Sequence, residues 1–230
     1  MKKIGLIGGM SWESTQVYYQ LINEMVNKKL GGFHSAKCVL ESVDFAEIEE
    51  LQHKDDWKTL AEIMVEAALN LEKAGAELAV LCTNTMHLCS EEIRQSTGIP
   101  FLHIAEATGT VIQKQNIKKV LLLGTRFTME KDFYKHILDE DFGIETLIPN
   151  KQDREAVHRI IYDELVHGNI KTESKQIYQA IIDKAVKAGA QGVILGCTEI
   201  PLLIQSGDVS VPVFDTTRIH ATSAVEFALK

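Results

Sequence analysis

The sequence is poor in the features on which disulfide-stabilised, membrane-spanning and nucleic-acid-binding proteins depend. It has four cysteines in 230 residues, too few for the disulfide framework of a small secreted domain, and only four prolines. No apolar run approaches the roughly 18 residues needed to cross a bilayer. The net charge is −8 and no basic stripe is present, which argues against binding to a nucleic-acid backbone. The composition indicates a globular protein without a disordered tail.

The first eight residues contain two lysines followed by an apolar stretch, an order that superficially fits a secretion signal. The stretch is too short for a signal, and Trp12 and Glu13 stand where small residues should mark a cleavage site. We therefore expect a first β-strand here, a cytoplasmic protein and no association with membranes.

The chain carries the same pattern twice. The sequence KAGA at 73–76 precedes an apolar run and then Cys82, and KAGA at 187–190 precedes another apolar run and then Cys197. Hydroxyl and polar residues follow both cysteines. Two further pairs of segments match in the same order: 4–11 with 120–127, and 99–102 with 211–214. Matched segments in one order predict two related halves, offset by about 115 residues.

Each half reads as alternating strands and helices. Short apolar runs, typical of parallel strands covered on both faces, occur at 4–8, 37–43, 78–82, 119–124 and 192–196. Amphipathic helices are expected between them, for example at 57–69 and at 157–165, with Gly168 as the stop of the second. The sequence thus predicts an α/β fold with two pseudo-symmetric domains, each a parallel sheet flanked by helices. We expect residues 1–98 plus 211–230 to form the first domain, and 99–210 the second.

Cys82 and Cys197 are the strongest catalytic candidates. Ligands of open parallel sheets bind at the carboxyl ends of the strands, where both cysteines are predicted to lie. The residues after each cysteine should begin a helix, whose N-terminus would lower the thiol pKa and bind a carboxylate. Two thiols in an interdomain cleft, one on each side of a carbon stereocentre, could remove a proton from one face and return one to the other.

An enolate-like intermediate of such a reaction needs fixed donors for its carboxylate, and polar side chains near the two cysteines are candidates. These are Asn84, Thr85, Thr125 and Thr198. The alternative for a single buried cysteine at a strand end is a small core residue. Two cysteines at equivalent points of a duplicated chain favour the catalytic interpretation.

The motifs around these cysteines resemble those of the aspartate/glutamate racemase family. Residues 82–87 (CTNTMH) and 196–203 (GCTEIPLL) look like its two signatures, and residues 8–15 (GGMSWEST) resemble its aspartate-racemase branch. The resemblance covers essentially the whole chain. It implies a two-base racemase that needs no pyridoxal phosphate or other cofactor, acts on a small amino acid, and has two similar α/β domains with the site between them. Homodimers are common in this family.

Departures from the family pattern bear on the substrate. Glutamate racemases typically have Asn after the first Cys and His at the position of Glu199, whereas this chain has Thr83 and Glu199. They also have an Asp-Ser pair in the first loop, where this chain has Gly9-Met10-Ser11. Strict aspartate racemases usually bind the side-chain carboxylate with an Arg and a Lys, and residues 43–52 contain no basic residue. The resemblance therefore favours a broad-specificity or aspartate-type racemase.

By position in the family pattern, several residues would line the substrate site. Met10 and Gln52 would face the variable side chain, and Glu199 could meet the α-ammonium group. Thr125 could equally be a helix N-cap, and Met10 a packing residue. The full substrate-binding set is Met10, Gln52, Asn84, Thr85, Thr125, Thr198 and Glu199.

Other functions remain open at this point. The nearest alternative is another enzyme of the same superfamily: a maleate isomerase, a hydantoin racemase or a decarboxylase. Members of the superfamily that use only one cysteine usually lack the second. Gly5, Gly8 and Gly9 weakly suggest a phosphate- or nucleotide-binding domain, without the complete glycine motif. A thiol or metal site would combine the two cysteines with His87 and Cys89, although the spacing fits no common zinc pattern. A non-catalytic interaction protein is the remaining class.

Overall fold

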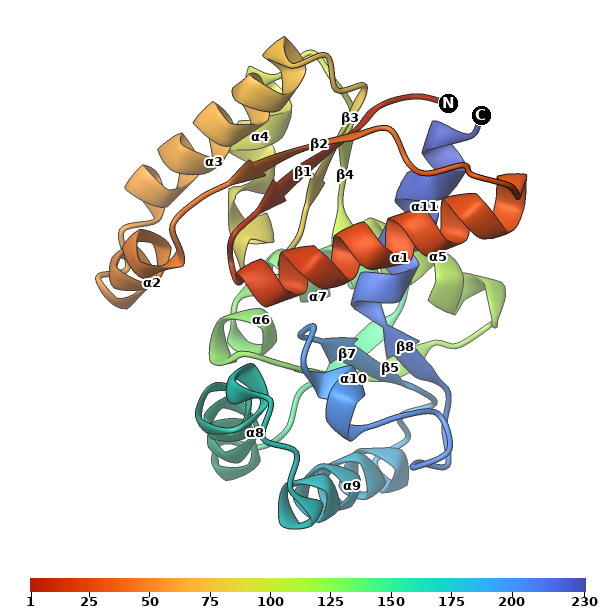
Figure 1. Cartoon of the computed structure of the whole chain (residues 1–230). Coiled ribbons are helices and arrows are strands. Elements are labelled where there is room, and N and C mark those ends of the chain that lie inside the picture. The colour runs from red at the N-terminus through yellow and green to blue at the C-terminus, as the bar shows by residue number, and fades with distance from the viewer. The chain divides into compact units, whose positions relative to one another are not determined.

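Two four-stranded parallel sheets, one in each half of the chain, form the framework of the protein (Figure 1). The computed structural model describes all 230 residues. Their contacts divide the chain into a first unit, Met1–Ile104 with His220–Lys230, and a second unit, Ala105–Ile219. The α/β fold and the parallel sheets predicted from the sequence are confirmed.

The sheet of the first unit has the strand order β2-β1-β3-β4. All five residues of β1 and all four of β3 are buried, as expected for strands with helices on both faces. β1 lies between β2 and β3, with Ile4 opposite both Cys38 and Leu78. The elements up to the end of this unit's sheet are β1 (Ile4–Gly8), α1 (Trp12–Leu30), β2 (Cys38–Ser42), α2 (Phe45–His53), α3 (Trp57–Lys73), β3 (Leu78–Leu81), the 3₁₀ helix η1 (Thr85–Cys89), α4 (Ser90–Ser96) and β4 (Phe101–Leu102).

The alternation of side chains along β1 and β3 separates two hydrophobic clusters in this unit. Ile7, Ala79 and Leu81 pack on one face with buried residues of α2, α3 and η1. Ile4 and Leu6 pack on the other face with α1 and with the last part of α11 (Thr216–Ala228). The first unit is thus a three-layer arrangement, with each face of its sheet closed by helices.

The second unit repeats this plan with the strand order β6-β5-β7-β8. Leu121 and Leu123 of β5 and Val193 and Leu195 of β7 pack with buried residues of α8, α9 and α10. The hydroxyl of Tyr134 in α7 donates to Thr108 Oγ1 in α5 over 3.0 Å. Its elements are α5 (Ile104–Lys114), β5 (Lys119–Gly124), α6 (Arg126–Glu130), α7 (Asp132–Glu140), β6 (Glu145–Leu147), α8 (Lys151–Asp163), the 3₁₀ helix η2 (Leu165–His167), α9 (Thr172–Lys187), β7 (Val193–Gly196), α10 (Ile200–Leu203) and β8 (Val213–Asp215).

The five strands expected from apolar runs are all present, as β1, β2, β3, β5 and β7. The short strands β4, β6 and β8 were not expected. The helix expected at 57–69 is α3, which begins after the N-cap Asp56 and buries Leu60, Met64 and Ala68 at helical spacing. The helix expected at 157–165 ends earlier, at Asp163, and Gly168 instead terminates η2 in a left-handed conformation. No helix combines the length and the apolar character that a membrane span requires.

The short strand β4 is at one edge of the first sheet, and β8 is at one edge of the second sheet. β4 pairs with β3, and β8 pairs with β7. The domain boundaries expected from the sequence, after residues 98 and 210, fall just before these strands. The contacts instead assign the chain to the second unit from Ala105 and back to the first from His220.

Three fully buried histidines, His87, His103 and His220, lie together in the first unit. The rings of His87 and His103 are 4.6 Å apart, and those of His87 and His220 are 5.6 Å apart. Burial lowers the pKa of His103 to about 3 and that of His220 to about 4, and it lowers the pKa of His87 well below its ordinary value. All three side chains are therefore neutral near pH 7.

This cluster predicts a loss of stability in mild acid. Because the folded-state pKa values lie below the unfolded value of about 6.5, the unfolded chain binds more protons as the pH falls through 6.5. The free energy of unfolding should drop by up to about 1.4 kcal/mol per pH unit for each histidine. His220 Nε2 donates to Leu102 O over 2.9 Å. The variant His220→Gln can keep this donor but cannot titrate, so its stability should fall less steeply between pH 6 and 4.5. Urea unfolding at several pH values measures the slope.

His34→Gln is the matched control, because it removes a histidine from an exposed position. Its slope should equal that of the wild type. Parallel curves for the wild type and His220→Gln would show that His220 does not contribute to the acid sensitivity.

Candidate functional site

Cys197 lies directly after β7, at the carboxyl end of the second sheet. Gly196 is opposite Gly124 in the register of β7 and β5. A Cβ at Gly124 would lie 2.9 Å from Gly196 O, and one at Gly196 would lie 2.9 Å from Leu123 O. Only glycine therefore permits this close approach of the two strand ends. It brings the loops that begin at Thr125 and Cys197 to the same edge of the sheet.

The thiol of Cys197 forms a hydrogen bond to a carboxylate. Its Sγ donates to Glu199 Oε2 over 2.8 Å, and both residues are partly exposed. Burial and the nearby Glu199 raise the pKa of the Cys197 thiol well above its ordinary value, whereas backbone N–H groups of Glu199 and Thr198 oppose this effect. The thiol is thus protonated at rest and has a proton acceptor in direct contact. Glu199, predicted to meet an α-ammonium group, contacts the cysteine in this structure.

Cys82 has a different environment. Its side chain is 1% exposed and belongs to the apolar cluster formed by β1, β3, α1 and α11. Its Sγ lies 4.0 Å from Val80 O. Burial alone raises the pKa of the Cys82 thiol far above its ordinary value. The expected net lowering of both thiol pKa values is not found, because burial outweighs the backbone N–H groups that lower the pKa of Cys197 and acts alone on Cys82.

The strand registers identify the counterpart of Cys197 in the first unit. Gly8 ends β1 as Gly124 ends β5, and Gly124 is opposite Gly196. In the first unit Ile7 is opposite Leu81, so the next step of the ladder places Gly8 opposite Cys82. Cys82 therefore corresponds to Gly196, and Thr83 corresponds to Cys197. Thr83 is partly exposed, unlike Cys82.

Side chains of α1 and η1 form hydrogen bonds to backbone carbonyls of the loop that follows β3. Ser14 Oγ, in the first turn of α1, donates to Cys82 O over 2.7 Å. His87 Nδ1 lies 2.8 Å from Thr83 O.

The turn after β1 requires glycine. Gly9 has φ +94°, and a Cβ there would clash with Val43 O. The Gly9 N–H donates to Thr15 Oγ1 over 2.8 Å, which occupies the amide that a phosphate-binding loop would present.

The other predicted residues of the first unit are buried. Met10 and Met86 belong to the same apolar cluster, and the side-chain amide of Gln52 donates to Met86 Sδ over 3.1 Å. Asn84 and Thr85 are at the start of η1 and are 5% and 7% exposed. The structure thus brings Gln52 close to η1, while Met10 lies within the apolar cluster.

In the second unit, the predicted residues gather at one edge of the sheet. Thr125 is the N-cap of α6, where its hydroxyl accepts from Thr128 N over 3.3 Å, so the capping alternative is confirmed. Thr198 is partly exposed next to Cys197. No group of three or more His, Cys, Asp or Glu side chains is arranged to hold a metal ion, so the metal alternative has no ligand set.

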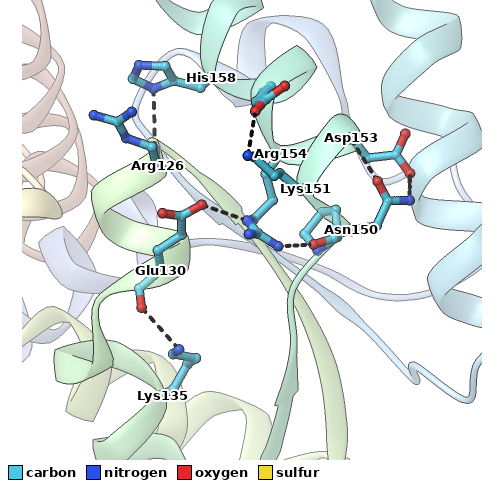
Figure 2. A network of polar contacts seen from close by, with 10 residues as sticks. Arg126, Glu130, Lys135, Asn150, Lys151, Asp153, Arg154 and His158 are labelled. Carbon is cyan, nitrogen blue, oxygen red and sulfur yellow. Dashed lines mark hydrogen bonds and ion pairs between the residues drawn. The ribbon is translucent and has the colours of Figure 1, made fainter.

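A polar network beside this edge includes a residue that the sequence analysis did not select. Arg126 follows Thr125, and its backbone N–H donates to His158 Nδ1 of α8 over 3.3 Å (Figure 2). Arg154 Nε donates to Glu130 Oε1 over 2.9 Å in the same network. The Arg126 side chain is exposed and forms no ion pair, and its guanidinium lies 5.6 Å from the Phe127 ring. Its position, next to the threonine that follows β5, is the signal that could have identified it.

The contact between Cys197 and Glu199 predicts a change in thiol reactivity. Since the carboxylate raises the thiol pKa, Glu199→Gln should lower that pKa and increase the thiolate fraction. We expect alkylation of Cys197 by iodoacetamide at pH 8 to become several-fold faster. Peptide mass spectrometry of the labelled protein over a pH series measures this rate. Glu173→Gln, an exposed position on α9, is the control and should leave it unchanged. Equal rates for Glu199→Gln and the wild type would contradict the assignment.

Comparisons with known proteins agree with this architecture. The family model of the Asp/Glu/hydantoin racemases matches residues 7–224. A crystal structure of a candidate Asp/Glu racemase from Yersinia pestis is 55% identical over the whole of both chains, with a TM-score of 0.96. That of an aspartate racemase homologue from Pyrococcus horikoshii OT3 is 40% identical over the whole of both chains, with a TM-score of 0.89. The broad-specificity amino-acid racemase RacX of Bacillus subtilis (strain 168) is 25% identical over 227 residues, 96% of each chain. The chain belongs to the Asp/Glu/hydantoin racemase family, whose racemases are isomerases.

Proposed function

We propose that this chain racemises amino acids by proton transfer at the α-carbon, without pyridoxal phosphate, and that Cys197 is one of its two acid–base groups. The contact between the Cys197 thiol and the Glu199 carboxylate carries this proposal. A partly exposed thiol bonded to a carboxylate can give up a proton and recover one, as racemisation requires of each group.

The reaction breaks the α-C–H bond on one face of the substrate and forms a new one on the other. A base takes the proton, and the electron pair of the bond delocalises into the α-carboxylate as an enolate. When Cys197 is the acid, its Sγ proton passes to the α-carbon, and backbone N–H groups of Thr198 and Glu199 stabilise the resulting thiolate. When Cys197 is the base, its own proton must first leave, and Glu199 Oε2 is the acceptor in contact with it.

For the opposing face, the loop after β3 offers two neighbouring side chains. Cys82, expected from the sequence, has the more acidic group, but its sulfur lies in an apolar cluster. Thr83 has the position that corresponds to Cys197 and is partly exposed. We propose Thr83 as the opposing group, with Cys82 as the alternative. When Thr83 is the acid, its Oγ passes a proton to the α-carbon, and the alkoxide that remains takes a proton from solvent water. When Thr83 is the base, its own proton must first leave to water, which is unfavourable for a hydroxyl, so the two directions of the reaction should differ in their limiting step.

Substitution of these three residues tests the proposal. The wild type, incubated with single L- or D-amino acids in ²H₂O without pyridoxal phosphate, should form the other enantiomer with deuterium at the α-carbon. Cys197→Ser and Thr83→Ala should each lose inversion by about 10²-fold or more, the usual contribution of an acid–base group. Cys82→Ser should retain inversion within a few-fold. Chiral chromatography and mass spectrometry measure both readouts.

Thr83→Ser is the matched control, because it keeps the hydroxyl, and it should retain most of the activity. Loss of inversion in Cys82→Ser together with full activity in Thr83→Ala would assign the opposing role to Cys82. If the wild type inverts no amino acid, the racemase proposal fails. Full activity of Cys197→Ser would remove Cys197 from the mechanism.

We further propose that the substrates include acidic amino acids and that Arg126 binds their side-chain carboxylate. The relatives named above include both an aspartate racemase homologue and a broad-specificity racemase. Arg126 supplies an exposed guanidinium without an ion pair at the edge of the sheet where Cys197 lies. A guanidinium binds a carboxylate through two parallel hydrogen bonds, which makes it selective for this group.

Removal of this charge should therefore change specificity. Arg126→Gln should lower kcat/KM for aspartate or glutamate by about 10-fold or more, the equivalent of about 1.4 kcal/mol for one charged hydrogen-bonded contact. Its kcat/KM for neutral amino acids should remain within a few-fold. Arg159→Gln removes the same charge from an exposed position on α8 and should change neither value. An equal loss on acidic and neutral substrates would contradict a role in specificity.

A further inference from the structure

His87 uses both of its ring nitrogens within the first unit. Nδ1 lies 2.8 Å from Thr83 O, and the backbone N–H of Ile104 donates to Nε2 over 3.2 Å. A carbonyl oxygen only accepts and a backbone N–H only donates. Nδ1 must therefore carry the proton and Nε2 the lone pair, which fixes a single neutral tautomer.

The surroundings of His87 keep it in this form. The side chain is fully buried and packs against the rings of Phe101, His103 and His220. Burial first, and then the two neighbouring histidines, hold its pKa well below the ordinary value. Because the ring is neutral and closely packed, its Nδ1–H is a donor of constant direction rather than a group that exchanges protons.

The two bonds of His87 join the loop after β3 to the segment that leaves β4. Thr83 O belongs to the residue that corresponds to Cys197, and Ile104 N is the first amide of α5. The preceding carbonyl, Cys82 O, is held by Ser14 Oγ. Two consecutive carbonyls of this loop, those of Cys82 and Thr83, thus each accept a hydrogen bond from a side chain. The backbone orientation that exposes the Thr83 side chain, with Cys82 in the core, depends on these two bonds.

We propose that His87 is a positioning residue that orients the Thr83 side chain for proton transfer by fixing the Thr83 carbonyl. This inference rests on the proposed racemase function and on the role of Thr83 in it. His87 itself touches neither the substrate nor the transferred proton. Its contribution is geometric, because proton transfer requires the donor within hydrogen-bond distance of the reacting carbon.

Two amide substitutions separate the two bonds of the ring. The side-chain amide of Asn can take the place of Nδ1 and donate to Thr83 O, whereas that of Gln reaches the place of Nε2. His87→Asn should therefore keep inversion within about 10-fold of the wild type. His87→Gln should lower inversion by about 10²-fold or more, the usual contribution of one acid–base group. Chiral chromatography of the amino acids measures this contrast.

The ratio of isotope exchange to inversion distinguishes positioning from a general structural role. With Thr83 misplaced, Cys197 can still remove and return a proton on its own side of the substrate. In His87→Gln, one enantiomer should therefore continue to incorporate deuterium from ²H₂O with retention while inversion falls. A structural defect would lower exchange and inversion in the same proportion, and that result in His87→Gln would overturn the proposal. So would equal inversion rates for the Asn and Gln variants.

The wild-type protein provides a test that does not depend on the stability of any variant. The ¹⁵N chemical shifts of His87 should show a protonated Nδ1 and an unprotonated Nε2, unchanged between pH 5 and 8. A protonated Nε2 would exclude the bond to Thr83 O and overturn the proposal. If the wild type neither exchanges nor inverts any amino acid but shows the expected tautomer, the racemase function fails rather than the anchoring of Thr83.

Discussion

The burial of each sheet on both faces is the constraint on which the rest of the structure depends. Helices close both faces of the first sheet, so nearly every side chain of β1 and β3 is apolar and inaccessible. Ligands of such sheets bind beyond the carboxyl ends of the strands, where side chains are no longer covered on both faces. Cys197, Thr83 and Thr125 all stand there, one or two residues after the last paired position of a strand. In each unit, the candidate residues lie where the covering of that unit's sheet ends.

At such strand ends, a shift of one residue decides between core and surface. Successive side chains of a strand point to opposite faces, so Cys82 and its neighbour Thr83 have opposite environments although both lie next to the same strand. In the second unit, Gly124 and Gly196 approach each other too closely for a side chain at either position. Cys197 is therefore the first residue after this pair that can have a side chain. In the first unit, the cysteine and the partly exposed position that corresponds to Cys197 are therefore one residue apart.

Much of this fold could be predicted from the sequence, for physical reasons. Continuous apolar runs such as residues 120–123 identify buried strands, and the KAGA repeat shows the duplication. The short strands β4, β6 and β8 have too few residues for a periodic signal. The partners of Glu199 and Gln52 depend on distances between side chains that spacing along the chain does not contain. Matching the two cysteines pairs Cys82 with Cys197, whereas Thr83 follows the first KAGA segment by as many residues as Cys197 follows the second. The hydrogen-bond register of the paired strands supports the pairing of Thr83 with Cys197. The order of effects on a thiol pKa likewise requires the actual burial.

The first turn of α1 has a consequence for how the family's sequence motifs are used. Its hydroxyls bind the protein's own backbone: Ser11 caps the helix, Ser14 holds Cys82 O, and Thr15 accepts from Gly9. The GGMSWEST segment at residues 8–15 therefore supports the neighbouring loop, and its hydroxyl contacts are to the protein's own backbone rather than to a bound amino acid. A substrate inferred from this motif alone would therefore be inferred from residues that stabilise the backbone. Discriminating residues should be sought where side chains have no internal partner to satisfy.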